Sequence, residues 1–220
     1  MAKKSLMYNH PKVYDLILKF LHGNSLKERY EIISREIGSN KKVIDVGCGT
    51  GKFAQFLDKT CEYNGIDLNE KFAEHAKNKG LNIKTGNLLD EKNYSQCDVT
   101  LICDVLHHVI PNDKKLIEIC MNISKKTIIC EPFTEDGFFN KCGGIFQNSR
   151  LFHNLLGEAD GVNTFEDMKE WLAHDRDDVI MLLESYGAKR TIIVGGDIIG
   201  IIENNGIQQK SGNNKNVILQ

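Results

Sequence analysis

A turn with three alternate glycines is the part of the chain best suited to hold a ligand. The apolar run 43–46 leads directly into Gly47, Gly49 and Gly51, and residues 52–57 then carry apolar side chains at the spacing of one helix face. Glycine tolerates positive φ and leaves the backbone open to a ligand that a Cβ would screen. A strand, a glycine turn and a helix in this order predict free backbone N–H groups facing a nucleotide-like ligand.

Three classes of ligand site use such a turn, and the spacing separates them. A P-loop requires Gly-x-x-x-x-Gly-Lys-[Ser/Thr], but Val46 stands at the first glycine position and Phe53 at the hydroxyl position. A dinucleotide site requires Gly-x-Gly-x-x-Gly with an acid about 20 residues further on. Asp67 meets the second condition, whereas Lys52 stands at the third glycine position, where it would obstruct close packing of helix on strand. The spacing excludes a P-loop and disfavours a nicotinamide-dependent oxidoreductase.

Short apolar runs alternate with amphipathic segments through the rest of the chain. We expect strands at 63–67, 82–85, 98–104 and 126–131. Helices are predicted after Asn69 and after Asn112. The runs 191–194 and 198–202, joined by a turn that begins Gly195-Gly196, predict a terminal β-hairpin. This alternation predicts an α/β fold with a doubly wound, mostly parallel sheet.

The pattern Asp-x-Gly-x-Gly-x-Gly at 45–51, the acid at 67 and the terminal hairpin resemble the class I S-adenosylmethionine (SAM)-dependent methyltransferases over roughly residues 40–203. The resemblance implies a Rossmann-like, mostly parallel seven-stranded sheet with a C-terminal antiparallel hairpin, SAM as cofactor, and in-line transfer of its methyl group to an acceptor. The stretch from Tyr14 to Tyr30 is loosely similar to the ubiquinone/menaquinone-biosynthesis methyltransferases, which implies a small or medium-sized metabolite as acceptor.

The resemblance also implies which residues hold the methionine part and the sugar of SAM. Gly47, Cys48 and Gly49 would face the methionine part through backbone atoms. Asp67 would accept hydrogen bonds from both ribose hydroxyls, for which a carboxylate is suited because it only accepts. Asp45 is expected to order the glycine turn through backbone N–H groups.

Four further cofactor contacts are implied at the ends of the predicted strands. Leu68 would flank the adenine, and the side-chain oxygen of Asn87 would meet its amino group, although relatives usually have an aspartate at that position. Leu88, the next residue of the same turn, is also expected to contact the cofactor. Asp104 would lie near the amino-acid end of SAM. A simpler alternative for Asp67 and Asp104 is that they only cap the helices that follow them.

His107, His108 and Glu131 are the candidates for proton transfer or for orienting the acceptor. Because the sulfonium donor is already reactive, a base is needed only for an acceptor such as a hydroxyl or an acidic carbon. Packing and capping are the alternative explanation for two adjacent histidines after a strand. No cluster of His, Asp or Glu has metal-ligand spacing, so we predict no metal.

The chain is expected to divide into a helical lid at 1–38, a SAM-binding domain at 39–203 and a flexible tail at 204–220. An insertion at about 132–187, rich in Phe and containing Trp171, is predicted to cover a partly apolar acceptor. Alternatively, its aromatic side chains only fasten helices to the sheet.

Composition narrows the class of protein and its partners. The 220 residues have a net charge of −2 and no Lys/Arg block longer than two, which argues against a nucleic-acid surface. The motif of amino-methylating DNA enzymes is replaced by Asp-Val-Leu-His at 104–107. Seven scattered cysteines, no apolar run of membrane-spanning length and no signal-peptide pattern predict a cytoplasmic protein. A homodimer is left open, and so is a non-catalytic subunit that binds SAM or its product.

Overall fold

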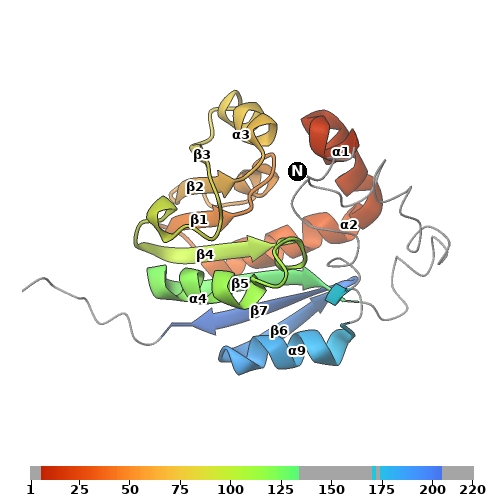
Figure 1. The fold of residues 1–220 in the computed structure, drawn as a ribbon, viewed down its shortest axis with the longest axis vertical. Coiled ribbons are helices and arrows are strands. Elements are labelled where there is room, and N and C mark those ends of the chain that lie inside the picture. Colours follow the sequence, from red (N-terminus) through yellow and green to blue (C-terminus); the bar gives the residue numbers. More distant parts are fainter. Residues whose placement is uncertain (1–5, 134–169, 172–173, 205–220) are drawn as a thin grey trace, which may run out of the picture.

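A seven-stranded sheet runs through the part of the chain that the computed structural model describes, which is residues 6–133, 170–171 and 174–204 (Figure 1). The strand order is β3-β2-β1-β4-β5-β7-β6. The first five strands pair in parallel, and β7 is antiparallel to both β5 and β6. The strands are β1 (Lys42–Val46), β2 (Glu62–Asp67), β3 (Ile83–Thr85), β4 (Cys97–Cys103), β5 (Ser124–Pro132), β6 (Ala188–Val194) and β7 (Asp197–Glu203).

This topology confirms the predicted mostly parallel sheet with a terminal antiparallel hairpin. Gly195 and Gly196 connect β6 to β7 as a two-residue turn, which is the loop length that tight hairpins favour. One detail differs from what a proline after a strand predicts. Pro132 does not stop the pairing of β5, because it still lies opposite Asp197 in the register with β7.

Helices cover both faces of the sheet and the open end of its parallel half (Figure 1). Among the described residues, the α-helices are α1 (Leu6–Asn9), α2 (Pro11–Ile37), α3 (Glu70–Lys77), α4 (Asp113–Ile123) and α9 (Arg176–Ser185). The same residues form the 3₁₀ turns η1 (Lys52–Gln55), η2 (Glu91–Asn93) and η3 (Leu106–His108). Gly23, with φ 51° and ψ −126°, kinks α2 near its middle.

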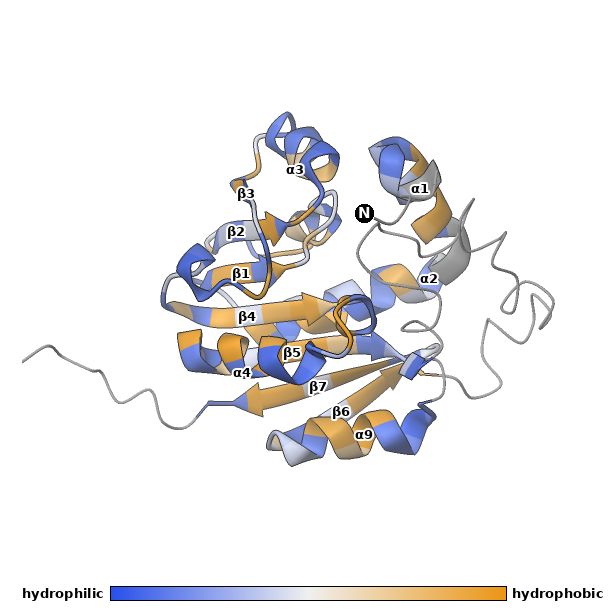
Figure 2. Ribbon diagram, viewed as in Figure 1, coloured by the Kyte–Doolittle hydropathy of each residue, from blue (hydrophilic) through white to orange (hydrophobic). Residues whose placement is uncertain are grey.

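Alternation along the central strands builds two apolar cores. On β4, Leu101 packs into the cluster that contains the α2 residue Ile33, whereas its neighbour Ile102 packs into the cluster that contains Leu116 of α4. Successive side chains of a strand point to opposite faces, so a strand buried on both sides must be apolar throughout. Figure 2 shows this apolar character along much of β4, β5 and β7.

The segment after the glycine turn differs from the prediction. Only η1 forms where the sequence predicts an amphipathic helix. Phe53 is buried, as the apolar pattern requires, and its ring meets that of Tyr30 at a centroid distance of 5.6 Å. A turn follows at once, in which Asp58 accepts a hydrogen bond of 2.9 Å from the N–H of Thr60. This side-chain bond competes with helical pairing and ends the segment.

Most of the predicted insertion at 132–187 and all but the first residue of the predicted tail lie outside the described residues. Within the described part, Trp171 is buried and its Nε1 donates a hydrogen bond of 3.1 Å to the carbonyl of Pro132. This contact agrees with the alternative in which an aromatic side chain of the insertion fastens a helical segment to the sheet.

Candidate active site

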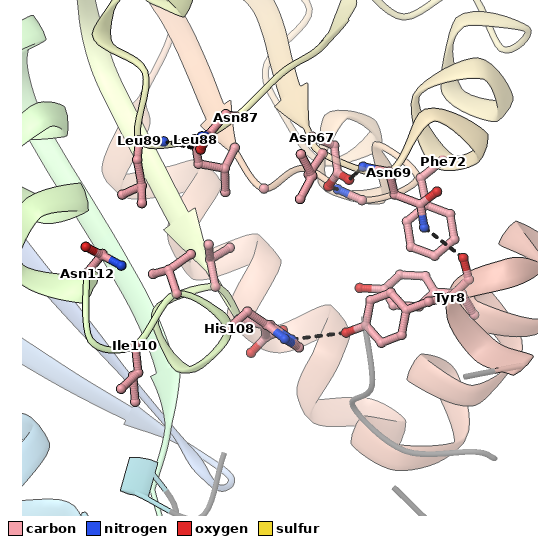
Figure 3. Close-up of a pocket in the computed structure, with 17 residues that line it drawn as sticks. Tyr8, Asp67, Asn69, Phe72, Asn87, Leu88, Leu89, His108, Ile110 and Asn112 are labelled. Carbon is pink, nitrogen blue, oxygen red and sulfur yellow. Dashed lines mark hydrogen bonds between the residues drawn. The ribbon is translucent and has the colours of Figure 1, made fainter. Parts of the chain in front are cut away.

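A cavity of about 310 Å³ lies beyond the carboxyl ends of β1, β2 and β4, where the direction of strand order reverses (Figure 3). Its volume lies at the lower end of the range of about 300–1,000 Å³ that is usual for small-molecule sites. Crevices at this point of open α/β sheets are the usual ligand sites. Eight of the predicted site residues line it: Gly47, Gly49, Asp67, Leu68, Asn87, Leu88, Asp104 and His108.

The glycine turn faces the cavity without offering the N–H groups that the sequence predicts. The N–H groups of Gly47 and Cys48 both donate to the carbonyl of Ile66, at 2.8 and 3.1 Å. The N–H of Gly49 donates to Asp67 at 2.7 Å, and that of Gly51 to the carbonyl of Cys48 at 2.9 Å. The prediction of free donors at these positions is wrong because the turn folds over the end of β2.

This arrangement bears on the charge of the ligand. Phosphate groups are bound at such turns by unpaired N–H donors. Here four of those donors are already bonded inside the protein, so they do not serve a phosphate. SAM carries an ammonium and a sulfonium and no phosphate, whereas a nicotinamide dinucleotide carries a pyrophosphate, so the turn fits SAM better.

Asp67 is held in place by two backbone hydrogen bonds. Its Oδ2 accepts from Gly49 and its Oδ1 from the N–H of Asn69, both at 2.7 Å. This bonding orients both carboxylate oxygens, which only accept hydrogen bonds, as ribose hydroxyls require. The cap of α3 is the side chain of Asn69, which accepts from the N–H of Lys71 at 3.1 Å. Asp67 is therefore not the helix cap of the alternative explanation.

The expected adenine side of the cavity has two leucines and an amide. Leu68 keeps 46% of its surface exposed at the cavity, and Leu88 is buried beside it. The Oδ1 of Asn87 accepts from the N–H of Leu89 at 2.9 Å. The oxygen that is expected to meet the adenine amino group thus also holds its own turn, and the adenine contact stays a prediction.

Asp104 stands at the wall of the cavity in a left-handed backbone conformation, with φ 57°. Both of its carboxylate oxygens bind the guanidinium of Arg29. Its N–H donates to the carbonyl of Cys130 at 2.9 Å. The side chain does not cap η3, whose N-cap is Val105 without a side-chain bond. The structure thus places Asp104 as an anchored carboxylate at the cavity.

Asp45 and Cys48 lie beneath the glycine turn, beside a smaller hollow that also reaches Gly47 and Asp104. Asp45 is buried and accepts a hydrogen bond of 2.7 Å from the hydroxyl of Tyr63. The sequence predicts that Asp45 orders the turn through backbone N–H groups. The N–H groups of Gly47, Cys48, Gly49 and Gly51 donate to other acceptors. Burial raises the pKa of Asp45 to about 7, against the Tyr63 hydrogen bond, which lowers it.

The three candidates for catalysis lie in different environments. His108 lines the cavity, and its Nε2 is 3.0 Å from the hydroxyl of Tyr8 (Figure 3). His107 is buried beneath it, with ring centroids 4.2 Å apart. Glu131 is fully buried and does not line the cavity: its Oε1 accepts from the N–H groups of Val105 and Leu106, and its Oε2 lies 2.8 Å from His107 Nδ1. Of the three, the structure brings only His108 to the cavity.

Sequence reasoning missed the aromatic wall of the cavity. Tyr8, Tyr14 and Phe72 line it, and their ring centroids are 4.6–5.9 Å apart. The other lining residues that were not predicted are Asn69, Leu89, Val105, Val109, Ile110 and Asn112. The aromatic residues of the N-terminal segment were the available signal, but nothing in one sequence shows that they return to strand ends far along the chain.

Comparisons with known proteins agree with this geometry. Residues 44–126 match the family model of a methyltransferase domain. The structure is similar to the methyltransferase domain of the bacterial protein CtHen1, with 20% identity, a TM-score of 0.58, and coverage of 81% of this chain and 99% of that one. It is also similar to the magnesium protoporphyrin IX methyltransferase of Synechocystis PCC 6803 with bound S-adenosylhomocysteine (SAH), at 17% identity, TM-score 0.57 and 83% coverage of both chains. A possible histamine N-methyltransferase from Thermotoga maritima gives 13% identity, TM-score 0.59, and coverage of 87% of this chain and 95% of that one.

No curated protein sequence gives a significant match. The sheet topology and the cavity at its switch point define a Rossmann-like methyltransferase fold. Together with the methyltransferase domain matched over residues 44–126, they support SAM-dependent methylation with SAM as the cofactor. The nicotinamide alternative has no support from these comparisons or from the bonded glycine turn.

Two further observations concern other classes of partner. Within residues 6–133, 170–171 and 174–204, none of the helices combines the length and the apolar character that crossing a bilayer requires. Over the same residues, no group of three or more His, Cys, Asp or Glu side chains is arranged to hold a metal ion.

Proposed function

We propose that this enzyme methylates a small or medium-sized metabolite that is partly apolar. The observation that carries the proposal is the N-terminal segment crossing the cavity. The hydroxyl of Tyr8 contacts His108 Nε2 at 3.0 Å on the acceptor side, and the Tyr8 carbonyl accepts from Asn69 Nδ2 at 2.8 Å on the cofactor side. An acceptor must fit under this segment or displace it, which favours a small molecule over a protein or nucleic-acid surface.

Further contacts hold the segment down and support the part of residues 1–38 that precedes Gly23 as a lid, whereas Leu26, Tyr30, Ile33 and Ile37 beyond it are buried in the core. The Thr50 hydroxyl donates to Asp15 Oδ1 at 2.5 Å, directly beside the glycine turn. Lys71 Nζ donates to Asn9 Oδ1 at 3.3 Å, next to the start of α3. Each of these bonds is modest by itself, of the order of 1 kcal/mol, so the segment can open without unfolding the sheet.

The lining under the segment supports a partly apolar acceptor. The rings of Tyr8, Tyr14 and Phe72 form one wall, and Val109 and Ile110 belong to another. Aromatic walls favour planar or apolar groups and also attract cations. Two of the similar structures are named for small acceptors, magnesium protoporphyrin IX and histamine, which is the size class proposed here.

The proposed chemistry is an in-line displacement in which the bond from the acceptor atom to the methyl carbon forms as the bond from sulfur to that carbon breaks. When bound, SAM supplies an electrophilic methyl group and leaves as neutral SAH. The protein aligns the acceptor and excludes water, which can contribute several kcal/mol. For a hydroxyl or an acidic carbon, His108 Nε2 would take the proton. His107 and Glu131 would act indirectly, by fixing the turn that carries His108.

Methyl-labelled SAM tests the proposal. Purified protein is incubated with a cell extract separated into small molecules, proteins and nucleic acids. We expect label in the small-molecule fraction. Label in the macromolecular fractions alone would contradict the proposal. Binding of SAH without turnover on any fraction would favour the alternative of a non-catalytic partner subunit.

Once an acceptor is known, Tyr8→Phe tests the contact between the Tyr8 hydroxyl and His108. It keeps the ring but removes the hydroxyl at His108, so kcat should fall about tenfold while the affinity for SAH changes less than about twofold. Tyr186→Phe, at the end of α9 and outside the cavity, is the matched control and should behave as the wild type.

A further inference from the structure

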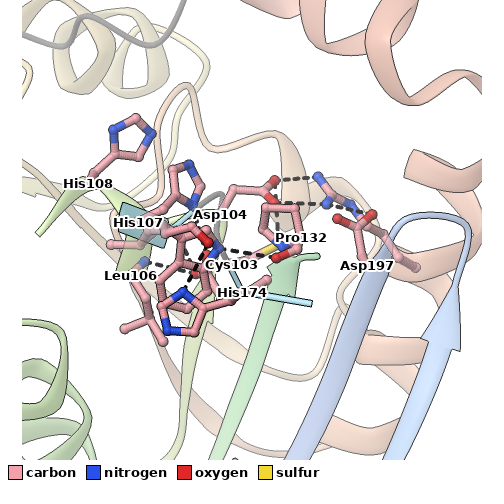
Figure 4. A network of polar contacts seen from close by, with 12 residues as sticks. Cys103, Asp104, Leu106, His107, His108, Pro132, His174 and Asp197 are labelled. Atoms are coloured by element: carbon pink, nitrogen blue, oxygen red, sulfur yellow. Dashed lines mark hydrogen bonds and ion pairs between the residues drawn. The ribbon is translucent and has the colours of Figure 1, made fainter. Parts of the chain in front are cut away.

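Arg29 of α2 is fully buried and binds two carboxylates that come from different strand ends. Its guanidinium contacts both oxygens of Asp104, just after β4, and its Nη1 lies 3.1 Å from Asp197 Oδ2 at the start of β7. Side-chain exposure is 0% for Arg29, 20% for Asp104 and 3% for Asp197. Figure 4 shows Asp104 and Asp197 in this network. One cation therefore ties together α2, the β4 turn and the terminal hairpin.

The two contacts with the Arg29 guanidinium fix the direction of the Asp104 side chain. Arginine presents a rigid, planar set of donors that matches a carboxylate with two parallel bonds. The Asp104 backbone is held as well, by the carbonyl of Cys130, and the next two N–H groups are held by Glu131. A left-handed conformation is uncommon for a residue with a Cβ and persists only where its surroundings determine it.

Asp104 is the one member of this cluster that lines the cavity, and it also lines the smaller hollow beneath the glycine turn. A carboxylate held at this wall attracts a positive charge that enters the cavity. The ammonium of the cofactor's amino-acid end has that charge and, by the family resemblance, comes to this end of the site.

We propose that Arg29 is a positioning residue for the cofactor: it anchors Asp104 so that the carboxylate receives the ammonium of SAM. Arg29 does not line the cavity and acts only through Asp104. The proposal concerns the amino-acid end alone. It rests on the SAM cofactor and is independent of which acceptor is methylated.

Two ligands that differ only at that end provide the test. SAH has the amino-acid end, and 5′-deoxy-5′-methylthioadenosine has the same nucleoside and sulfur without it. In Arg29→Met, affinity for SAH measured by calorimetry should fall at least about tenfold, because an anchored charge-assisted bond is lost. Affinity for methylthioadenosine should change less than about twofold. Equal weakening of both ligands, or no weakening of SAH, would overturn the proposal.

Three variants keep the result interpretable. Arg29→Lys keeps the charge without the paired guanidinium donors, so we expect an intermediate loss of affinity confined to SAH. This variant replaces Arg29→Met in the test if Arg29→Met does not fold. Asp104→Asn should show the same selective loss as Arg29→Met. Arg190→Met removes an arginine that pairs with Glu36 on the surface, away from the cavity, and should leave both affinities unchanged. Selective loss in Arg190→Met would show that the effect is not specific to the Arg29 cluster.

Discussion

The carboxylate of Asp67 accepts a hydrogen bond of 2.7 Å from the backbone N–H of Gly49. The residue expected to hold the ribose is therefore bonded directly to the turn expected to face the methionine part. The bond also joins the end of β2 to the turn that follows β1. Any change that moves Asp67 must move the turn, so the two halves of the cofactor site cannot vary independently.

Asp67→Asn should weaken SAH binding by about tenfold or more. The amide replaces one acceptor oxygen by a donor, which then faces the N–H of either Gly49 or Asn69 and offers one acceptor less to the ribose. Charge-assisted hydrogen bonds contribute about 1.5–3 kcal/mol, which corresponds to at least a tenfold change in affinity. Calorimetric titration with SAH measures this. Asp90→Asn, an exposed cap of η2 outside the cavity, is the control and should bind like the wild type. Equal affinity for SAH in both variants would show that Asp67 does not bind the cofactor.

The pH dependence of stability should report on Asp45. Burial raises its pKa from 3.8 to about 7, the hydrogen bond from Tyr63 opposes the rise, and the charge of Asp67 adds to it. The folded protein thus binds this proton more tightly than the unfolded chain. The stabilisation is complete below pH 3.8 and is lost as the pH rises towards 7, at up to about 1.4 kcal/mol per pH unit.

Asp45→Asn keeps an acceptor for Tyr63 but cannot titrate. The free energy of unfolding of the wild type, measured with urea, should therefore fall relative to Asp45→Asn by about 1–3 kcal/mol between pH 5 and 8. Asp197, whose pKa is also raised to about 7, is present in both proteins and cancels in the difference. A difference that stays constant over this range would show that Asp45 is ionised throughout.

Glu131 should matter for stability more than for binding. Glu131→Ala leaves two buried N–H groups and His107 Nδ1 without their partner, at about 1–3 kcal/mol for each orphaned group, so we expect a loss of at least about 3 kcal/mol in urea unfolding. Glu131→Gln keeps an oxygen for both N–H groups and should lose less. Because the side chain does not line the cavity, Glu131→Gln should bind SAH within about threefold of the wild type. Full stability with abolished turnover in Glu131→Gln would instead indicate a direct role in catalysis.

The sheet and much of the cofactor side could be predicted because they depend on local patterns. Buried parallel strands require continuous apolar runs, and acids at their ends must gather at one edge of the sheet. The predictions fail where a contact joins elements that lie far apart in the sequence. The donors of the glycine turn are taken by the end of β2, and Tyr8 reaches His108 across 100 positions of the chain. No local pattern predicts the contacts of Arg29, because nothing in the sequence around it indicates the two carboxylates that it binds.

Gly47 offers the sharpest test of how tightly the site is assembled. A Cβ at this position would lie 2.5 Å from Val105 Cγ2, on a turn whose N–H groups are fixed by Glu131, and the φ of 73° is itself unfavourable for alanine. Gly80, which follows α3, has a similar φ of 84°, but a Cβ added there would have nothing within 4 Å. Both variants to alanine bear the backbone cost of about 1 kcal/mol, whereas only Gly47→Ala adds a clash of about 1–3 kcal/mol.

The comparison of the two variants therefore isolates the contact between the glycine turn and the β4 turn. Gly47→Ala should be less stable than Gly80→Ala in urea unfolding by about 1–3 kcal/mol. It should also bind SAH at least about tenfold more weakly, because relief of the clash must move either Gly47 or the turn that carries Asp104 and His108. Gly80→Ala should bind SAH normally. Normal binding by Gly47→Ala would mean that the two turns can separate without disturbing the cofactor, and the rigid site inferred from their packing would then be wrong.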